Sequence, residues 1–167
     1  HSYFNLNGGG TAMEHTLTLA AETYLETSPG CLPTGRALPV AGTPFDFRTA
    51  KTVGRDIGAP EEQLRLVNGY DHHFCVDGGG LRRAAVLRDD RSGITMAVDT
   101  TSPGVQLYTA NWLSRRNGKD GAVYEPRCAV CLEPQFPPDA VHHPGFPQPL
   151  LRKGEVYRHC TVYTFSK

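Results

Sequence analysis

Residues 94–110 read ITMAVDTTSPGVQLYTA, and two segments of this stretch, 94–101 and 105–110, alternate between apolar and polar side chains. Alternation with a period of two is expected of a β-strand that has one buried face and one solvated face. Ser-Pro-Gly stands between the segments at 102–104, and these residues are typical of turns. The stretch therefore predicts two short β-strands separated by a turn.

The same pattern recurs along the rest of the chain. Helical periodicity is nearly absent, and the best candidate is APEEQLRLV at 59–67, where Pro60 suits a first turn. Many short strands punctuated by glycine and proline predict an all-β protein, either a sandwich or a barrel. The further alternating segments lie at 15–20, 127–133 and 155–165, and the further turn signals at 28–30, 77–80, 89–93 and 117–121.

The composition indicates one domain with a hydrophobic core, because 39% of the 167 residues are hydrophobic and 20% are charged. Lys+Arg and Asp+Glu both number 17, so no basic surplus points to a nucleic acid or an anionic membrane as a partner. No apolar run approaches the roughly 20 residues of a membrane-spanning helix. The 5 cysteines show no spacing typical of a small disulfide scaffold, which predicts reduced thiols and a cytoplasmic location.

Cys128 and Cys131 form a C-x-x-C motif that is followed by His142 and His143. A zinc site of this kind needs a second ligand pair at a recognised spacing. On a strand, side chains three residues apart also point to opposite faces, so the two cysteines do not converge. The sequence therefore predicts no metal ion.

Three positions carry groups suited to proton transfer. His1 opens HSYFNL, Asp71 precedes paired histidines in NGYDHHF (68–74), and Glu133 stands before Pro134 where an apolar strand meets a proline-rich loop. A carboxylate at the end of a strand is well placed to project into a cleft. Each position also has a structural alternative: a turn for Gly-Tyr-Asp, a polar edge for the His-His pair, and a solvated surface charge for Glu133.

Six segments of the chain resemble, in order, the motifs of the galactose mutarotases, or aldose 1-epimerases. One such match can arise by chance, whereas six in the right order identify the chain as a member of this family. The matching segments are HSYFNL (1–6), LPTGRALPVAGTPFDFR (32–48), GYDHHF (69–74), TTSPGVQLYTANWL (100–113), GKDGAVY (118–124) and CLEPQFPPDAVHHPGFP (131–147).

The resemblance implies a large antiparallel β-sandwich with an open sugar-binding cleft. Family members are longer, and residues 1–167 resemble only the C-terminal portion of their single domain, so we expect the N-terminal portion to be absent. That portion carries an arginine and a histidine of the family's sugar site. His142 and His143 lie in the tail segment and are poor substitutes for them.

The implied activity is the interconversion of the α and β anomers of an aldohexose such as galactose or glucose. The ring opens and recloses by acid–base chemistry that needs no cofactor. By resemblance, Glu133 is the base, His1 is the acid, and Asp71 and Gln106 bind sugar hydroxyls. An ordinary glutamate titrates near ~4.3 and an ordinary histidine near ~6.5, so at neutral pH the first is ionised and the second is mostly neutral. For the imidazole to serve as the acid, a nearby carboxylate should raise its pKa.

Several other side chains lie near the matched motifs. Asp46 and Arg48 in FDFR share a face if they lie on a strand, which favours a structural ion pair over a catalytic role. The chain departs from the family where His73 replaces the usual asparagine and where Pro134 follows the glutamate. Four aromatic residues either stack on the sugar or pack in the core: Tyr3, Phe4, Tyr108 and Trp112.

Three alternatives to an aldose 1-epimerase remain open. The first is a non-catalytic carbohydrate-binding or regulatory protein on the same fold, against which the retained Glu133 counts. The second is a relative of the sugar-phosphate epimerases, which would need Arg or Lys clustered near the cleft. The third is an inactive fragment with exposed strand edges. The expected partner is a small-molecule sugar, with no nucleic acid and no membrane, in a protein that is a monomer or homodimer when complete.

Overall fold

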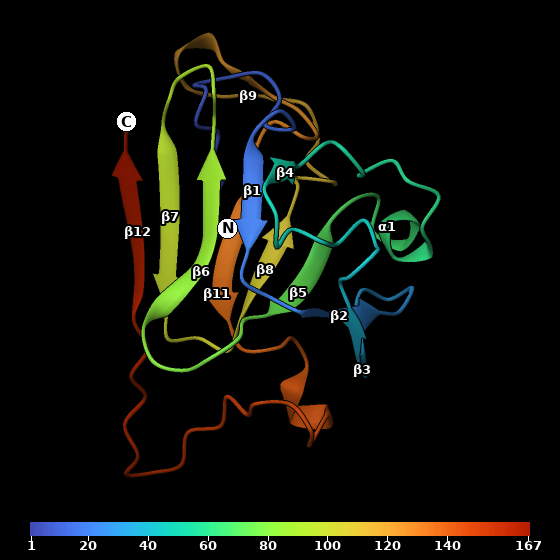
Figure 1. The fold of residues 1–167 in the computed structure, drawn as a ribbon, viewed down its shortest axis with the longest axis vertical. Helices are drawn as coiled ribbons and strands as arrows, with labels where there is room; N and C mark the ends of the chain where they lie inside the picture. The colour runs from blue at the N-terminus through green and yellow to red at the C-terminus, as the bar shows by residue number, and fades with distance from the viewer.

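The computed structural model describes all residues from 1 to 167 and contains two five-stranded antiparallel sheets that lie face to face (Figure 1). The first sheet has the order β12-β7-β6-β1-β4, with β1 (Thr16–Leu19), β4 (Lys51–Thr52), β6 (Arg82–Arg88), β7 (Thr95–Thr100) and β12 (Thr161–Ser166). The second sheet has the order β11-β8-β5-β2-β3, with β2 (Thr23–Thr27), β3 (Pro33–Pro39), β5 (Asp71–Cys75), β8 (Gly104–Tyr108) and β11 (Cys131–Gln135).

The remaining elements are short. One α-helix, α1, spans Glu62–Leu66, and no helix of the structure is long and apolar enough to cross a membrane. The other elements are a hairpin of β9 (Arg116–Asn117) and β10 (Val123–Tyr124) and two 3₁₀ turns, η1 (Lys119–Gly121) and η2 (Ala140–His142).

The core lies between the two sheets. Along β7 every second residue is buried, and Met96 and Val98 point inward to meet Val105 and Leu107 of β8 in one cluster of 23 buried residues. Removal of this apolar surface from water is the main force that holds the sheets together. The predicted all-β class and the antiparallel sandwich are confirmed.

The stretch 94–110 connects the two sheets. Its two predicted strands match β7 and β8, but β7 belongs to the first sheet and β8 to the second. The turn at 102–104 therefore carries the chain across the sandwich, where a tight turn within one sheet would have paired the two strands. Alternation predicted the strands correctly, but it carries no information about which strands pair.

Two predicted strands begin later than expected. The strand predicted at 127–133 begins at Cys131, because the chain first makes a turn in which Arg127 has a left-handed φ of 70°. The strand predicted at 155–165 begins at Thr161, since the residues before it are exposed and lie outside the ladder. The segment 15–20 matches β1.

The predicted helix at 59–67 is confirmed but shorter. Its N-cap is Glu61, whose side chain accepts a hydrogen bond from the backbone N–H of Leu64 at 3.1 Å. Pro60 therefore precedes the helix and does not form part of its first turn. The sequence patterns missed β2, β3 and β5 of the second sheet and β4 and β6 of the first.

Pro134 does not end the strand that carries Glu133. The ladder between β11 and β8 continues through Pro134, opposite Val105, and on to Gln135. β11 is the edge strand of the second sheet, and an edge strand tolerates proline because one of its sides has no ladder to complete. The prediction that Glu133 marks the end of a strand is therefore wrong, and Glu133 is the central residue of β11.

Candidate active site

Three polar residues form a row across the outer face of the second sheet. In the strand register Glu133 of β11 lies opposite Gln106 of β8, and Gln106 lies opposite His73 of β5. Directly paired residues point to the same face, so the three side chains project together. Asp71, two residues before His73, shares this face, and its Oδ1 accepts a hydrogen bond from Nε2 of Gln106 at 2.8 Å.

His1 lies beside this row. Its Nε2 is 3.8 Å from Oε1 of Glu133, a distance longer than a hydrogen bond, so both atoms remain available to a third group. The imidazole ring is also in edge contact with Tyr108, with ring centroids 5.2 Å apart, and is stacked against Tyr3 at 5.4 Å. The structure thus brings together all four residues that the sequence analysis proposed as the site: His1, Asp71, Gln106 and Glu133.

The segment that carries His1 is attached to the body of the protein. Phe4 and Val130 exchange two backbone hydrogen bonds of 2.9 Å each, which place the segment alongside the start of β11. The buried backbone N–H of Leu6 donates to Nε2 of His15 at 2.9 Å. These contacts hold the first residues of the chain against the strand that carries Glu133.

Burial sets the electrostatics of the two carboxyl groups. It raises the pKa of Glu133, an effect that the amino group of His1 opposes and that the carboxylate of Asp71 reinforces. Burial also raises the pKa of Asp71, while the hydrogen bond from Gln106 acts in the opposite direction. A half-buried carboxylate with a raised pKa is a stronger base than an exposed one, which suits Glu133 to remove a proton from a bound molecule.

An open cavity of about 460 Å³ adjoins the pair formed by His1 and Glu133. Its walls come from the edge strand β11, from the first residues of the chain and from β12. The lining residues are His1, Ser2, Leu132, Glu133, Pro134, Gln135, Thr161 and Tyr163.

The structure separates the four aromatic candidates. Tyr3 and Tyr108 flank His1 and therefore border the site. Phe4 instead packs against the ring of Tyr163, at a centroid distance of 5.4 Å, next to the core. Trp112 is 63% exposed, and its backbone N–H donates to the hydroxyl of Tyr108.

The structural alternatives for the two carboxylates and the paired histidines are not observed. The turn lies before Asp71, which is the first residue of β5, and only 24% of the Glu133 side chain is exposed. The histidine pair is no polar edge, since His72 and His73 are both buried. His73 is the residue of this row that was not proposed as a site residue. A period of two counted from Asp71 would have placed it on the same face.

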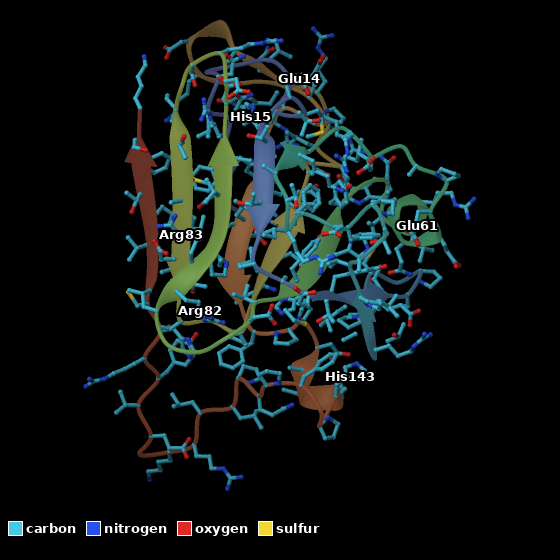
Figure 2. The ribbon with its side chains drawn as sticks, viewed as in Figure 1. Glu14, His15, Glu61, Arg82, Arg83 and His143 are labelled. Carbon is cyan, nitrogen blue, oxygen red and sulfur yellow. The ribbon has the colours of Figure 1, made fainter.

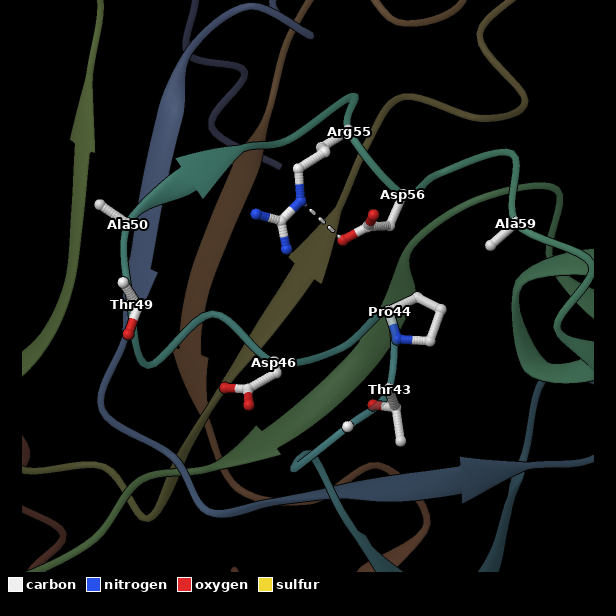
Figure 3. Close-up of a pocket in the computed structure, with 9 residues that line it drawn as sticks. Thr43, Pro44, Asp46, Thr49, Ala50, Arg55, Asp56 and Ala59 are labelled. Carbon is white, nitrogen blue, oxygen red and sulfur yellow. Dashed lines mark hydrogen bonds and ion pairs between the residues drawn. The ribbon is translucent and has the colours of Figure 1, made fainter.

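Asp46 and Arg48 form the predicted ion pair, with Arg48 Nη2 2.8 Å from Asp46 Oδ2, although they lie in a loop and not on a strand. The bond from Arg48 lowers the pKa of Asp46 to about 2. Asp46 borders a separate hollow of about 480 Å³, which is also lined by the neighbouring Arg55 and Asp56, themselves an ion pair (Figure 3). None of the proposed site residues lines this hollow.

The cysteines and the tail histidines form no shared cluster of ligands, although Cys75 and His143 line one cavity. All five cysteines are free thiols, and no three His, Cys, Asp or Glu side chains are grouped as metal ligands. His143 lies beyond η2 on the tail segment, below the second sheet in Figure 2, and its Nε2 is 3.9 Å from Asp139 Oδ2. His142 contacts the same carboxylate.

Comparison with known proteins places this geometry in a family. Residues 1–164 match the sequence model of the aldose 1-epimerase family. Galactose mutarotase from Homo sapiens is 43% identical over 99% of this chain and 48% of its own length. Aldose 1-epimerase from Escherichia coli is 37% identical over 99% of this chain and 49% of its own length. The chain thus spans about half the length of the curated relatives it matches.

Solved structures agree with the sequence comparison. The crystal structure of an aldose epimerase homologue from C. elegans superposes with a TM-score of 0.89 at 32% identity, covering 99% of this chain and 50% of the other. The galactose 1-epimerase from Lactobacillus acidophilus superposes with a TM-score of 0.67 at 26% identity, covering 99% of this chain and 47% of the other. In motif order, fold and sequence, the chain belongs to the aldose 1-epimerase family.

Proposed function

We propose that the protein is an aldose 1-epimerase that interconverts the α and β anomers of aldohexoses such as galactose and glucose without a cofactor. The observation that carries this proposal is the placement of His1 and Glu133, whose reactive atoms are 3.8 Å apart at the edge of one face of the second sheet. Asp71 and Gln106 lie on the same face and offer hydrogen bonds to sugar hydroxyls. The free state of all five cysteines supports a cytoplasmic location.

The proposed reaction needs one base and one acid. The carboxylate of Glu133 removes the proton from the anomeric hydroxyl, and the protonated imidazole of His1 gives a proton to the ring oxygen. The bond between the anomeric carbon and the ring oxygen breaks, which leaves an open-chain aldehyde and a hydroxyl. After rotation about the bond between the first two carbons, the hydroxyl attacks the other face of the aldehyde. The two proton transfers then run in reverse and restore both groups.

The raised pKa of Glu133 has a direct consequence for the pH profile. The base must be ionised, so the rate falls as the pH drops through the pKa of Glu133. Because burial raises this pKa above its ordinary value, we expect the acid limb of the rate profile to lie at a higher pH than that of an exposed glutamate.

Polarimetry of freshly dissolved α-D-galactose tests the proposal. We expect the chain to accelerate the approach to equilibrium rotation, and Glu133→Gln to lower the acceleration by roughly 10²–10⁴-fold, the usual effect of one positioned proton transfer. The matched control is Glu14→Gln, because Glu14 is exposed and lies at the upper end of β1 in Figure 2, away from the row of site residues.

Each outcome has a definite meaning. Acceleration that Glu133→Gln abolishes and Glu14→Gln leaves unchanged would show that these residues hold a working acid–base pair. No acceleration by a folded chain, combined with saturable binding of galactose, would favour the carbohydrate-binding alternative for this chain. Equal activity of the wild type and Glu133→Gln would contradict the assigned base.

A further inference from the structure

His73 is a buried histidine without a partner. Its residue surface is only 2% exposed, and neither ring nitrogen has a hydrogen-bond partner. The Oε1 atom of Gln106, which lies opposite His73 in the register, is also buried and unpaired. Buried polar groups in folded proteins are nearly always paired, so three unpaired atoms on two facing residues require an explanation.

The neighbouring His72 is a useful contrast. It points to the inner face, where its ring packs against the edges of Tyr24 and Phe45 at centroid distances of 5.7 and 4.7 Å. Its Nδ1 accepts a hydrogen bond from the backbone N–H of Asp71 at 3.1 Å, while its Nε2 is buried without a partner. His72 is thus a packed core residue, whereas His73 points to the face that carries the proposed site.

Gly104 leaves room for the His73 ring, and a cavity lies next to the ring. A Cβ atom on Gly104 would lie 2.1 Å from Nε2 of His73, so only glycine at this position leaves room for the imidazole. The ring borders a cavity of about 460 Å³ between the second sheet and the tail segment that carries His143. The other walls are mainly apolar and include Leu25, Ala37 and Phe146.

The chemistry of the cavity selects a neutral ligand. Burial lowers the pKa of His73 to about 4, so the ring is neutral at pH 7 and offers one N–H donor and one nitrogen acceptor. Gln106 does not line this cavity, but it lies opposite His73 in the register and carries the unpaired acceptor Oε1. No Lys, Arg, Asp or Glu lines the cavity, and its other ionisable groups are the Cys75 thiol and the His143 imidazole. A charged group entering it would therefore lose its hydration with little counter-charge to replace it. A hydroxyl group, which both donates and accepts, complements these atoms.

We propose that His73 and Oε1 of Gln106 form a subsite for a hydroxyl group of the sugar at the end remote from its anomeric carbon, with the apolar cavity walls contacting the adjacent C–H surface. This inference rests on the proposed function, which puts the anomeric carbon at Glu133. His73 lies two strands from Glu133, which is about 10 Å at the usual strand spacing. His73 is therefore a specificity-determining residue that hydrogen-bonds the end of the sugar remote from the anomeric carbon.

Nuclear magnetic resonance of the ¹⁵N-histidine-labelled chain tests the subsite without requiring turnover. We expect the ring nitrogens of His73 to shift on titration with galactose, while those of the exposed His159 do not. His73→Phe identifies the signals, because it keeps a ring and removes both nitrogens, and His73→Gln is the substitute if the first variant does not fold. No shift of the His73 signals at saturating or at the highest attainable galactose concentration would overturn the proposal.

The binding of deoxy sugars, each of which lacks one hydroxyl, identifies the hydroxyl that His73 binds. We expect the wild type to bind one of two deoxy sugars, 4-deoxy-galactose or 6-deoxy-galactose, roughly tenfold more weakly than galactose. We expect His73→Phe to bind galactose and that deoxy sugar with equal affinity. His159→Phe is the matched control and should keep the wild-type preference. If His73→Phe discriminates as the wild type does, the proposal is wrong.

Polarimetry keeps this inference separate from the proposed function. Turnover that Glu133→Gln abolishes, without any sugar-dependent change at His73, would leave the enzyme intact and remove the subsite. A sugar-dependent shift at His73 without any turnover would support the subsite and contradict the activity of this chain.

Discussion

The two sheets of the sandwich bury their inner faces alike but differ in how completely their polar side chains are paired. In the first sheet, Arg83 and Asp99 pair across neighbouring strands at 2.8 Å, and buried His15 bonds Leu6 and lies 3.3 Å from Asp89. Five buried side-chain polar atoms have no hydrogen bond, and all but Nδ1 of His15 belong to β5 or β8 of the second sheet. Polar groups that the fold does not pair are therefore concentrated on the sheet that carries the proposed site.

This contrast indicates a division of roles. Paired polar groups and packed apolar groups in the first sheet stabilise the sandwich. In the second sheet the unpaired atoms of His73 and Gln106 lie on the face that carries the proposed site, whereas the unpaired Nε2 of His72 lies in the core. Substitutions in the two sheets should therefore separate stability from activity.

Leu87→Ala in β6 should have the largest effect on folding. Leu87 is fully buried in the core, and truncation of such a leucine costs about 2–5 kcal/mol because it leaves a cavity. Urea denaturation followed by circular dichroism measures the loss. The rate of galactose mutarotation per folded molecule should stay at the wild-type value, and a rate that falls in proportion to the lost stability would contradict the division of roles.

Gln106→Leu should show the opposite behaviour. The change removes both the hydrogen bond to the Asp71 carboxylate and the unpaired Oε1, and these two losses act on stability in opposite directions. We therefore expect activity to fall roughly 10–100-fold with little change in folding stability. Polarimetry and urea denaturation of the same preparation measure both quantities. A strongly destabilised Gln106→Leu protein would mean that Gln106 is primarily a structural residue.

The pH dependence of stability should have opposite signs in the two sheets. Burial raises the folded pKa of Asp71 above 3.8, so its contribution is fully present below that value and is lost as the pH rises through the raised pKa. Asp89 has a lowered pKa, chiefly because it accepts the backbone N–H of Ser92, so its contribution is present above 3.8 and is lost as the pH falls through the lowered pKa.

Asp71→Asn should therefore raise the Tm at pH 7, with the gain shrinking toward pH 4, and Asp89→Asn should lower the Tm at pH 7, with the loss shrinking at acidic pH. Thermal unfolding followed by circular dichroism between pH 3 and 8 measures both trends. Two variants with the same sign of pH dependence would argue against the difference between the sheets.

Asp99→Asn should have the smallest effect. The ion pair with Arg83 lies on the outer surface, where such pairs contribute about 0.2–1 kcal/mol and are screened by salt. We expect a small loss of stability in dilute buffer that disappears in 1 M NaCl, measured by urea denaturation at both salt concentrations. A large loss that persists in salt would show that Asp99 also has a packing role.

The elements that alternation predicted and those that it missed differ in composition. Burial alternates residue by residue along β7, and in β8 the inward-facing Val105 and Leu107 are both buried with Gln106 less buried between them. β5 reads DHHFC and begins with aspartate, which is rare in strands, while β3 contains proline and glycine and lies at an exposed edge. Their strand conformation is imposed by their neighbours in the sheet, which local patterns do not reveal.

Motif resemblance predicted which residues form the proposed site, but it did not predict how they are arranged in space. Register places Glu133, Gln106 and His73 in one row, and register depends on pairing between strands that are far apart in sequence. Pro134 obscured the central position of Glu133 because proline normally marks the end of a strand. The absence of partners around His73 becomes visible only when all of its neighbours are placed.

The attachment of the first residues to the start of β11 also has a kinetic consequence. Asn5 donates to the backbone carbonyl of Cys128 at 2.7 Å, a contact between residues 123 positions apart along the chain. Contacts of such high sequence separation form late, because a long loop must close before they gain anything. During refolding from urea, catalytic activity should therefore return after most of the β-sheet signal, which makes the acid–base pair a reporter of the last stage of folding.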